Sequence, residues 1–339
     1  MLKIGVSTDA VEWIRSYLSG RVQQTTANGI VSDSKEINCG VPQGSVLGPL
    51  LFVIYINSIV DSIKNGKYYL YADDLAVVVG NRDPVMAQQL LQADLDSIGE
   101  WCNKYQLTIN TAKTKVLWCY SDRDKTDYSR YNLVMKNETL RVVSHFTYLG
   151  VIVDCFLSLN PQCNKIISSG NFRLYQLRKL KKYIDQHLSL LLYKQMVLPI
   201  FDYGDVMTDS GSDGLVGDIQ ILQNHCLRAC IGIQDPQMIS RPDLHTLCDC
   251  SMLDVRRKCN LLSRMYHLSR DVDNTVVPVR DLRGNSKIKI KVQRPKCALY
   301  KHSPLYRGHV EWCKLDAEDQ KIDSHDMCMQ NIKLLNGLK

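Results

Sequence analysis

The sequence predicts an α+β fold over residues 1–155, followed by an all-helical region over 156–275 and a basic, loosely structured C-terminal region over 276–339. Two observations carry this prediction. Up to about residue 155, short β-prone runs alternate with amphipathic helical patterns, as is typical of α+β domains. From about residue 160 the β-prone runs end and apolar residues recur at helical spacing.

The first section contains the elements that bear most on function. A short amphipathic helix is predicted over Val11–Leu18, and an apolar helix over Leu47–Ile56 behind a Gly-Pro pair. Two β-prone runs, Tyr68–Tyr71 and Leu75–Val79, flank a short polar turn and predict a hairpin. The Asp-Pro pair at 83–84 supplies an N-cap and a first-turn proline, and predicts that a helix starts there.

Further elements follow in both sections. Three strands are predicted in the first section: Lys115–Cys119, Leu140–Val143 and Tyr148–Val153. Three long helices are predicted in the second: Ile166–Ile184, Leu188–Tyr203 and Ile219–Ile231.

Length and composition exclude several classes of protein. The chain has 339 residues, of which 45% are hydrophobic, close to the globular average. No apolar run reaches the ~18 residues that a membrane span needs, and the N-terminus has no apolar signal segment. The 13 cysteines are scattered and odd in number. We therefore expect a reduced, intracellular chain in the nucleus or cytoplasm, neither secreted nor bound in a membrane.

The net charge of +7 is unevenly distributed. Residues 161–200 carry seven Lys or Arg against one acidic residue, and residues 256–301 carry thirteen against three. An acidic first half followed by two basic stretches fits a polyanionic partner. The alternative is that the basic runs are solvated helix faces.

Adjacent carboxylates occupy the turn of the predicted hairpin. Tyr71-Ala72-Asp73-Asp74 places two acids on an exposed loop, where they repel each other. Two close carboxylates suit a divalent metal such as Mg²⁺, which takes oxygen ligands and retains waters for substrate phosphates. The alternative is a turn whose aspartates serve only its conformation.

Four motifs in order resemble the reverse transcriptases of non-long-terminal-repeat (LINE-type) retrotransposons. Gly40-Val-Pro-Gln-Gly44 is similar to motif B of that family, and Tyr71–Asp74 to motif C. Leu107-Thr-Ile-Asn110 with the Lys-Thr pair at 113–114 resembles motif D, and Phe146–Gly150 resembles motif E, the primer grip. The resemblance extends over nearly the whole chain, through an Asp-Tyr-Gly run at 202–204 and a helix ending in Leu-Arg at 227–228.

The resemblance implies a partial polymerase palm over 1–155, an antiparallel sheet with helices, followed by a helical thumb and connection. In that family two metal ions promote nucleotidyl transfer, which extends a DNA primer on an RNA template. Asp73 would be the principal metal ligand and Asp74 the second, with Mg²⁺ as the expected ion. Because both ligands come from one hairpin, we expect the metal to be bound weakly. Further residues would position nucleotide and template: Gln43, Gly44, Tyr71, Ala72 and Lys113.

The implied partners are an RNA template, a DNA primer and deoxynucleoside triphosphates, with no obligate protein partner. Tyr148, Leu149 and Gly150 would hold the primer strand. The backbone of the heteroduplex would be contacted, without regard to sequence, by basic residues of the helical section: Arg173, Arg178, Lys179, Lys181 and Lys182.

The chain departs from the family pattern before motif B. The family carries another catalytic aspartate in motif A, on a strand preceding a Tyr-Leu-Ser-like segment, here at 17–19. Asp9 is the acid nearest that place, and we interpret it as a helix-start residue. Motif A and the fingers are therefore expected to be missing, as in an N-terminally truncated copy, and we expect the chain alone not to polymerise.

Two alternatives remain at this stage. The chain could be a non-catalytic remnant that retains nucleic-acid affinity through its basic half, or a transposon relic without selected function. A zinc site is also conceivable at His245, Cys248, Cys250 and Cys259, but the Cys-x-Cys spacing is unusual for zinc. We therefore interpret these cysteines, and Cys226 and Cys230 of the preceding helix, as small buried thiols.

Overall fold

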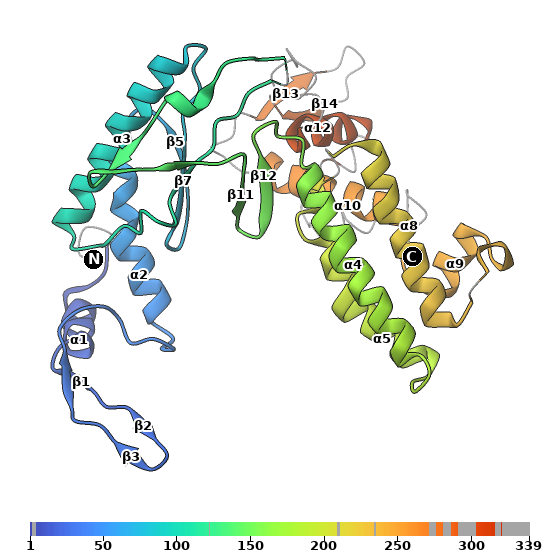
Figure 1. The fold of residues 1–339 in the computed structure, drawn as a ribbon, viewed down its shortest axis with the longest axis horizontal. Coiled ribbons are helices and arrows are strands. Elements are labelled where there is room, and N and C mark those ends of the chain that lie inside the picture. Colours follow the sequence, from blue (N-terminus) through green and yellow to red (C-terminus); the bar gives the residue numbers. More distant parts are fainter. Residues whose placement is uncertain are drawn as a thin grey trace. The chain divides into compact units, whose positions relative to one another are not determined.

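The computed structural model describes residue 1, residues 5–121, 123–208, 211–233, 235–270, 276–280, 286–290 and 303–315, and residue 320. The chain forms two compact units. The first comprises Met1–Val116 and Lys125–Val142, and the second comprises Leu117–Asp124 and Val143–Lys339. Helices are combined with small, mostly antiparallel strand pairs, which confirms the α+β class (Figure 1). The assignment of palm and thumb, and the three-part division of the chain, stay predictions.

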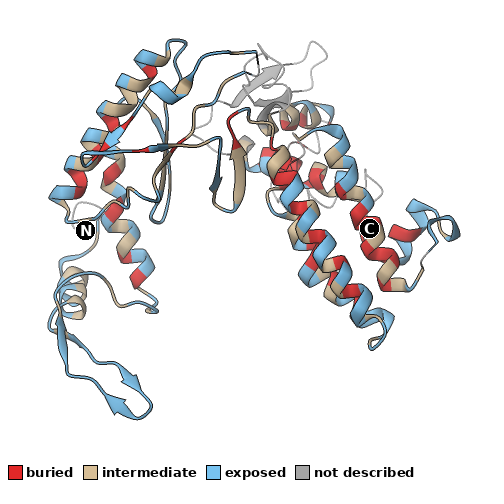
Figure 2. Cartoon of the chain, in the orientation of Figure 1, coloured by how far each residue is buried: buried red, intermediate tan, exposed pale blue. Residues whose placement is uncertain are grey.

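The first unit begins with an exposed segment. Helix α1 (Thr8–Leu18) confirms the predicted helix; Ser7 is its N-cap, and Asp9 lies in its first turn, as expected of a helix-start residue. Two antiparallel pairs follow, and no residue from Gly5 to Cys39 is buried (Figure 2). Their strands are β1 (Arg21–Gln23) with β4 (Lys35–Ile37), and β2 (Thr26–Ala27) with β3 (Ile30–Val31).

The middle of this unit contains the predicted apolar helix and the predicted hairpin. Helix α2 (Gly48–Ile56) buries Leu51 and Ile56 but leaves Leu50 and Val53 exposed. It runs into the 3₁₀ turn η2 (Asn57–Ser62). Strands β5 (Lys67–Tyr71) and β6 (Asp74–Val78) then pair antiparallel, as predicted.

Helix α3 (Pro84–Lys104) is the long helix of the first unit. Asp83 is its N-cap and accepts a hydrogen bond from the Val85 N–H at 3.0 Å, which confirms the predicted start. The remaining elements of the unit are short: β7 (Lys115–Val116), which pairs in parallel with β10 (Arg141–Val142), the 3₁₀ turn η3 (Tyr128–Arg130), and the hairpin of β8 (Val134–Met135) with β9 (Glu138–Thr139).

The second unit contains a hairpin where a single strand is predicted over Tyr148–Val153. Strands β11 (His145–Tyr148) and β12 (Val151–Asp154) pair antiparallel around a two-residue turn at Leu149-Gly150. Both turn residues have positive φ, 45° and 81°, which no strand can accommodate. The prediction of one continuous strand was therefore wrong.

Helices make up most of the rest of the second unit. All three helices predicted for this section are found. The one predicted over Leu188–Tyr203 consists of two α-helices with a π turn between them. The elements are α4 (Asn160–Leu180), α5 (Gln186–Leu192), the π turn η4 (Tyr193–Val197), α6 (Leu198–Asp202), α7 (Asp205–Thr208), α8 (Asp213–Ile231), η5 (Pro236–Met238), α9 (Arg241–Leu247) and α10 (Leu253–Arg270). Strands β13 (Val276–Arg280) and β14 (Ser286–Ile290) pair antiparallel, and α12 (Pro304–Lys314) follows.

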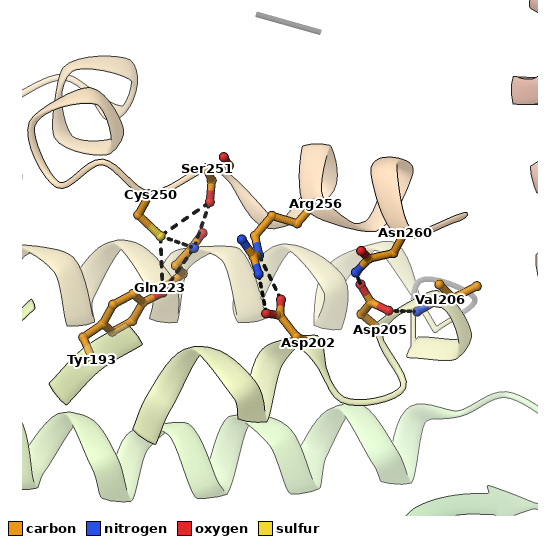
Figure 3. A network of polar contacts seen from close by, with 9 residues as sticks. All are labelled: Tyr193, Asp202, Asp205, Val206, Gln223, Cys250, Ser251, Arg256 and Asn260. Atoms are coloured by element: carbon orange, nitrogen blue, oxygen red, sulfur yellow. Dashed lines mark hydrogen bonds and ion pairs between the residues drawn. The ribbon is translucent and has the colours of Figure 1, made fainter. Parts of the chain in front are cut away.

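The core of the second unit lies where α4, η4, α6 and α8 meet. Tyr193 and Phe201 are buried there together with leucines and cysteines of α4 and α8. A second cluster packs Trp312 of α12 against Leu262 and Met265 of α10. Polar side chains also join these helices: Gln223 donates to the Tyr193 hydroxyl at 3.2 Å and to the Ser251 carbonyl at 3.1 Å, and Arg256 binds both carboxylate oxygens of Asp202 (Figure 3).

Candidate active site and nucleic-acid surface

Asp73 and Asp74 lie at the tip of the β5–β6 hairpin. Tyr71 and Asp74 are paired across the two strands, so Ala72 and Asp73 form a two-residue loop. Paired residues of an antiparallel hairpin project from the same face, which places the Tyr71 ring beside the Asp74 carboxylate. All four residues are exposed, Tyr71 by 66%. The hairpin therefore presents both carboxylates to solvent.

The loop has a backbone conformation that its sequence disfavours. Ala72 has a φ of +51°, and of the two loop residues it alone has positive φ. Alanine rarely adopts this region because its Cβ crowds the backbone, at a cost of about 1 kcal/mol. Strained residues of this kind concentrate at functional sites, since stability alone would select glycine there.

The carboxylate of Asp94 holds the start of the hairpin. This side chain of α3 is only 1% exposed. It accepts hydrogen bonds from the backbone N–H groups of Lys64, Asn65 and Gly66 at 2.7–3.2 Å, and from the Asn65 side chain at 3.0 Å. Because β5 begins at the next residue, Asp94 anchors the strand that leads to Tyr71.

The donor set at the tip suits one hard divalent cation. Carboxylate oxygens are the protein ligands Mg²⁺ prefers, and one or two of them with several waters is a usual set for it. In the described part of the chain the carboxylates of Asp73 and Asp74 make no hydrogen bond or ion pair, although the Asp74 backbone is paired with that of Tyr71. Both carboxylates are therefore available as ligands. Over the same residues, no third His, Cys, Asp or Glu joins them in a cluster that could hold a metal ion.

The Pro42–Ser45 segment forms a tight turn before α2. The Ser45 N–H donates to the Pro42 carbonyl at 3.3 Å, and Gly44 at the third position has a φ of +77°. A type II turn requires such a φ there, which explains the glycine. The Ser45 hydroxyl accepts from the Gly48 N–H at 3.0 Å and thereby ties the turn to the start of α2. Gln43 and Gly44 are consequently fixed and exposed.

Lys113 lies in an exposed turn before β7. Its N–H donates to the Asn110 side-chain oxygen at 3.0 Å, and its own side chain is directed to no described partner. Among the described contacts of the first unit, no hydrogen bond or ion pair links Lys113, Gln43 or Gly44 to the hairpin tip. Tyr71, Ala72, Asp73 and Asp74 thus lie together on one hairpin, and the positioning roles of Gln43, Gly44 and Lys113 stay predictions.

In the second unit, the turn between β11 and β12 is fixed by three side chains. The Tyr203 hydroxyl donates to the Leu149 carbonyl, and the Lys165 ammonium donates to the Gly150 carbonyl at 3.0 Å. Gln162 accepts from the Ile152 N–H at 2.9 Å. Tyr203 belongs to the Asp-Tyr-Gly run singled out in the sequence, and it is this contact that gives the run a structural role.

The five basic residues predicted to contact nucleic acid do not share one face. Arg173 and Lys179 line an open groove between α4 and η4. Arg178 instead lies close enough to His225 of α8 to affect its titration, and Lys181 lies beside Gly232 at the end of α8. Lys182 is exposed beyond the end of α4.

The groove includes residues that the sequence reasoning missed. Phe172 and Tyr175 are 59% and 54% exposed on its rim, with the Lys179 ammonium 4.6 Å from the centre of the Tyr175 ring. A second open groove adjoins it and shares Phe172 and Arg173. The signal was present in the helical spacing: one stripe of α4 carries Lys165, Ser169, Phe172, Gln176 and Lys179.

The cysteines behave as packing residues. Cys226, Cys230, Cys248, Cys250 and Cys259 are all buried, as predicted. Burial raises the pKa of Cys226 and of Cys248 to about 12. Among the described residues, no three His, Cys, Asp or Glu side chains are grouped so that they could hold a metal ion. His245 contacts the Cys250 carbonyl and the Asn224 side chain, at 2.7 and 2.8 Å, and is therefore engaged within the protein.

The helices can be compared with what a membrane-spanning segment requires. Within the ranges that the structure describes, none of them combines the length and the apolar character that crossing a bilayer requires.

Residues 2–153 match the family model described as reverse transcriptase (RNA-dependent DNA polymerase). The chain is 28% identical over 273 residues to the RNA-directed DNA polymerase from the mobile element jockey of Drosophila funebris, covering 77% of this chain and 29% of that protein. It is 26% identical over 261 residues to the probable RNA-directed DNA polymerase from transposon X-element of Drosophila melanogaster, covering 75% and 28%. The chain thus spans less than a third of the length of these relatives.

Proposed function

We propose that the chain carries the metal-binding hairpin and the primer–template surface of an RNA-directed DNA polymerase of a LINE-type retrotransposon. Its residues 2–153 match the reverse transcriptase family, and its sequence is similar to the RNA-directed DNA polymerases from jockey and transposon X-element. The observation that carries the proposal is the pair of exposed, unpartnered carboxylates at the β5–β6 tip, inside the segment that matches the family model. The substrates are an RNA template, a DNA primer and deoxynucleoside triphosphates.

In this proposal Asp73 and Asp74 hold Mg²⁺, with Asp73 as the principal ligand. The ion, when bound, supplies charge neutralisation at the triphosphate and activation of the primer 3′-hydroxyl. Tyr71 and Ala72 lie beside the primer end, Gln43 and Gly44 support the nucleotide against the template, and Lys113 neutralises phosphate charge. Tyr148, Leu149 and Gly150 position the primer strand.

The α4 groove is proposed as the surface that follows the nucleic-acid backbone. Lys165, Arg173 and Lys179 supply positive charge along about four turns of one helix, where phosphates bind without regard to sequence. Phe172 and Tyr175 add exposed aromatic rings, on which bases or sugars pack. The combination of cations and aromatic rings along these two adjoining grooves favours a nucleic acid over a protein partner.

Catalysis by this chain alone is not part of the proposal. Two adjacent carboxylates suffice for one ion, but a second ion needs a further bridging carboxylate, and the described residues add none. We expect the chain to bind nucleic acid and not to polymerise. Binding without catalysis, as in a non-catalytic remnant, is thus the second candidate function.

Primer extension on an RNA template with Mg²⁺ or Mn²⁺ tests the catalytic part. No incorporation is expected from the chain alone; incorporation that is abolished in Asp73→Asn would contradict that expectation. The metal site itself is tested by Mn²⁺ binding followed by water proton relaxation. Asp73→Asn should weaken Mn²⁺ binding at least tenfold, whereas Asp61→Asn, at an exposed acid outside the hairpin, should not change it.

Duplex binding at two salt concentrations tests the groove. The double variant Arg173→Gln with Lys179→Gln should weaken binding of an RNA–DNA duplex and reduce its salt dependence, since about two phosphate contacts are removed. Arg130→Gln with Lys125→Gln, at two positions of the first unit, is the charge-matched control. Equal losses of duplex affinity in both variants would show non-specific charge attraction. If the wild type shows no salt-dependent binding at all, the interpretation as a transposon relic is favoured.

A further inference from the structure

Arg228 of α8 is a buried arginine without an acidic partner. The residue is only 8% exposed, and its Nε atom is buried without a hydrogen-bond partner. In the described part of the chain no hydrogen bond or ion pair involves its guanidinium. Burying an unpaired charge is costly, so charged side chains in such positions are normally paired.

Two further unpartnered side chains lie beside it. His225 is on the same side of α8, three residues earlier, where side chains of a helix are neighbours. Arg178 comes from the adjacent helix α4 and is exposed. Neither side chain has a described hydrogen bond or ion pair.

The packing of α4 against α8 places Arg178 at the height of His225 and Arg228 along α8. A Cβ built on Gly170 would lie 2.6 Å from Leu222, and Lys181 lies 3.8 Å from a Cβ built on Gly232. The helices therefore run side by side in the same direction, with Arg178 between these two contact levels. Helical side chains point back toward the N-terminus, which directs Arg178 toward the level of His225 and Arg228.

Like charges dominate the surroundings of these three groups. Burial lowers the pKa of His225, and the positive charges of Arg228 and Arg178 lower it further. Arg228 also lowers the pKa of His245 on α9. Among the described residues, no acidic side chain contributes to the titration of His225. Cationic groups that converge without a carboxylate leave room for an external anion.

We propose that Arg178, His225 and Arg228 form a binding site for a phosphate group. Two guanidinium groups present paired N–H donors that match phosphate oxygens, and an imidazole beside them adds a further donor. The site faces a different side of α4 from the Phe172–Lys179 groove, since Arg178 is rotated about 100° from Lys179 along the helix. It does not rest on the proposed polymerase function. The phosphate comes either from a nucleic-acid strand or from a free phosphate.

Titration of His225 by NMR in the full-length chain tests the site, with the resonance assigned by His225→Gln. Inorganic phosphate, compared with chloride at equal ionic strength, should raise the pKa of His225, because the bound anion offsets the two arginines. A single-stranded DNA oligonucleotide is the second arm. An upward shift with the oligonucleotide alone identifies a strand phosphodiester, and one with inorganic phosphate identifies free phosphate. No difference from chloride in either arm overturns the proposal.

Arg228→Met supplies a second measurement that does not depend on NMR. Methionine fills the space of the aliphatic stem without a charge, so the variant should fold, and its Tm in chloride should not fall. We expect phosphate to raise the Tm of the wild type, and the same rise in Arg228→Met should require at least roughly tenfold more phosphate. Arg173→Met, in the groove, should retain the wild-type phosphate dependence. Equal phosphate dependence in wild type and Arg228→Met would exclude the site.

Discussion

Asp94 on α3 accepts a hydrogen bond of 2.7 Å from the backbone N–H of Gly66, the residue directly before the hairpin that carries the two candidate metal ligands. The same carboxylate accepts from the two preceding backbone N–H groups. One buried side chain thus satisfies three consecutive backbone donors, and the orientation of the hairpin relative to α3 depends on it.

Asp94→Ala is expected to destabilise the chain by about 3 kcal/mol, because three backbone N–H groups lose a charged acceptor in a buried place. Urea unfolding of the full chain measures the change. Asp96→Ala, two residues away on the same helix and exposed, is the matched control and should change stability by no more than about 0.5 kcal/mol. A similar effect of both substitutions would argue against the anchor.

Ala72→Gly is expected to stabilise the hairpin. Glycine adopts the φ of +51° without the Cβ strain that alanine suffers there, and we expect a gain of about 0.5 kcal/mol in the free energy of unfolding. Ala76→Gly, in the regular part of β6, should instead cost about 0.5–1 kcal/mol. Thermal unfolding of both variants compares them; loss of stability in Ala72→Gly would show that the turn is not strained.

Tyr203→Phe is expected to loosen the turn between β11 and β12. The substitution removes the hydrogen bond to the Leu149 carbonyl and retains the ring, at a cost of about 1 kcal/mol. Gly150→Ala should cost more, since it combines a φ of +81° with a Cβ placed 3.0 Å from the Tyr203 ring. Hydrogen exchange of the β11 and β12 amides reports both effects. Unchanged protection in Tyr203→Phe would contradict this role.

Acid should destabilise the second unit through His245. Burial lowers its pKa from the ordinary 6.5, although the Cys250 carbonyl and Asp254 act in the opposite direction and Arg228 in the same one. Above pH 6.5 the folded and unfolded chains both hold a neutral imidazole. As the pH falls below about 6.5, the unfolded chain takes up a proton that the folded chain resists, and the free energy of unfolding decreases until the pH reaches the folded pKa.

Urea unfolding between about pH 7.5 and pH 5.5 measures this loss. His225, whose pKa is lowered as well, contributes in the same sense. His245→Gln and His225→Gln should therefore each reduce the pH dependence, and the double variant should reduce it most. His187→Gln, at an exposed position, serves as the control. A pH dependence untouched by all of these variants would assign the effect to other groups.

The hairpin and α3 could be predicted because their signals are local. Apolar alternation around Asp73 and Asp74 defines the hairpin, and Asp83-Pro84 defines the start of α3. The anchor Asp94 could not be predicted, because its partners lie 28–30 residues away. Nothing in the local sequence distinguishes Asp94 from the exposed Asp96 except the helical face on which each lies.

Other elements depended on contacts that the sequence does not display. The turn at Leu149-Gly150 places a leucine at positive φ, and Tyr203, 54 residues away, secures it. The π turn at Tyr193–Val197 interrupts what the apolar spacing predicted as one helix, where Tyr193 is fully buried. Helical periodicity predicts that Arg178 lies on a different face of its helix from Arg173 and Lys179. It does not predict which of these faces is covered, because that depends on the position of α8.

The two units are joined by more than one covalent connection. The chain passes from the first unit to the second after Val116, returns after Asp124, and leaves again after Val142. A recombinant fragment ending near residue 116 therefore lacks β10, the partner of β7, and one beginning near residue 143 lacks the 117–124 segment, whose Tyr120 N–H donates to the Cys155 carbonyl at 3.0 Å. No single cut therefore yields both units intact: a cut after Val116 deprives the first unit of residues 125–142, and a cut after Val142 deprives the second unit of residues 117–124.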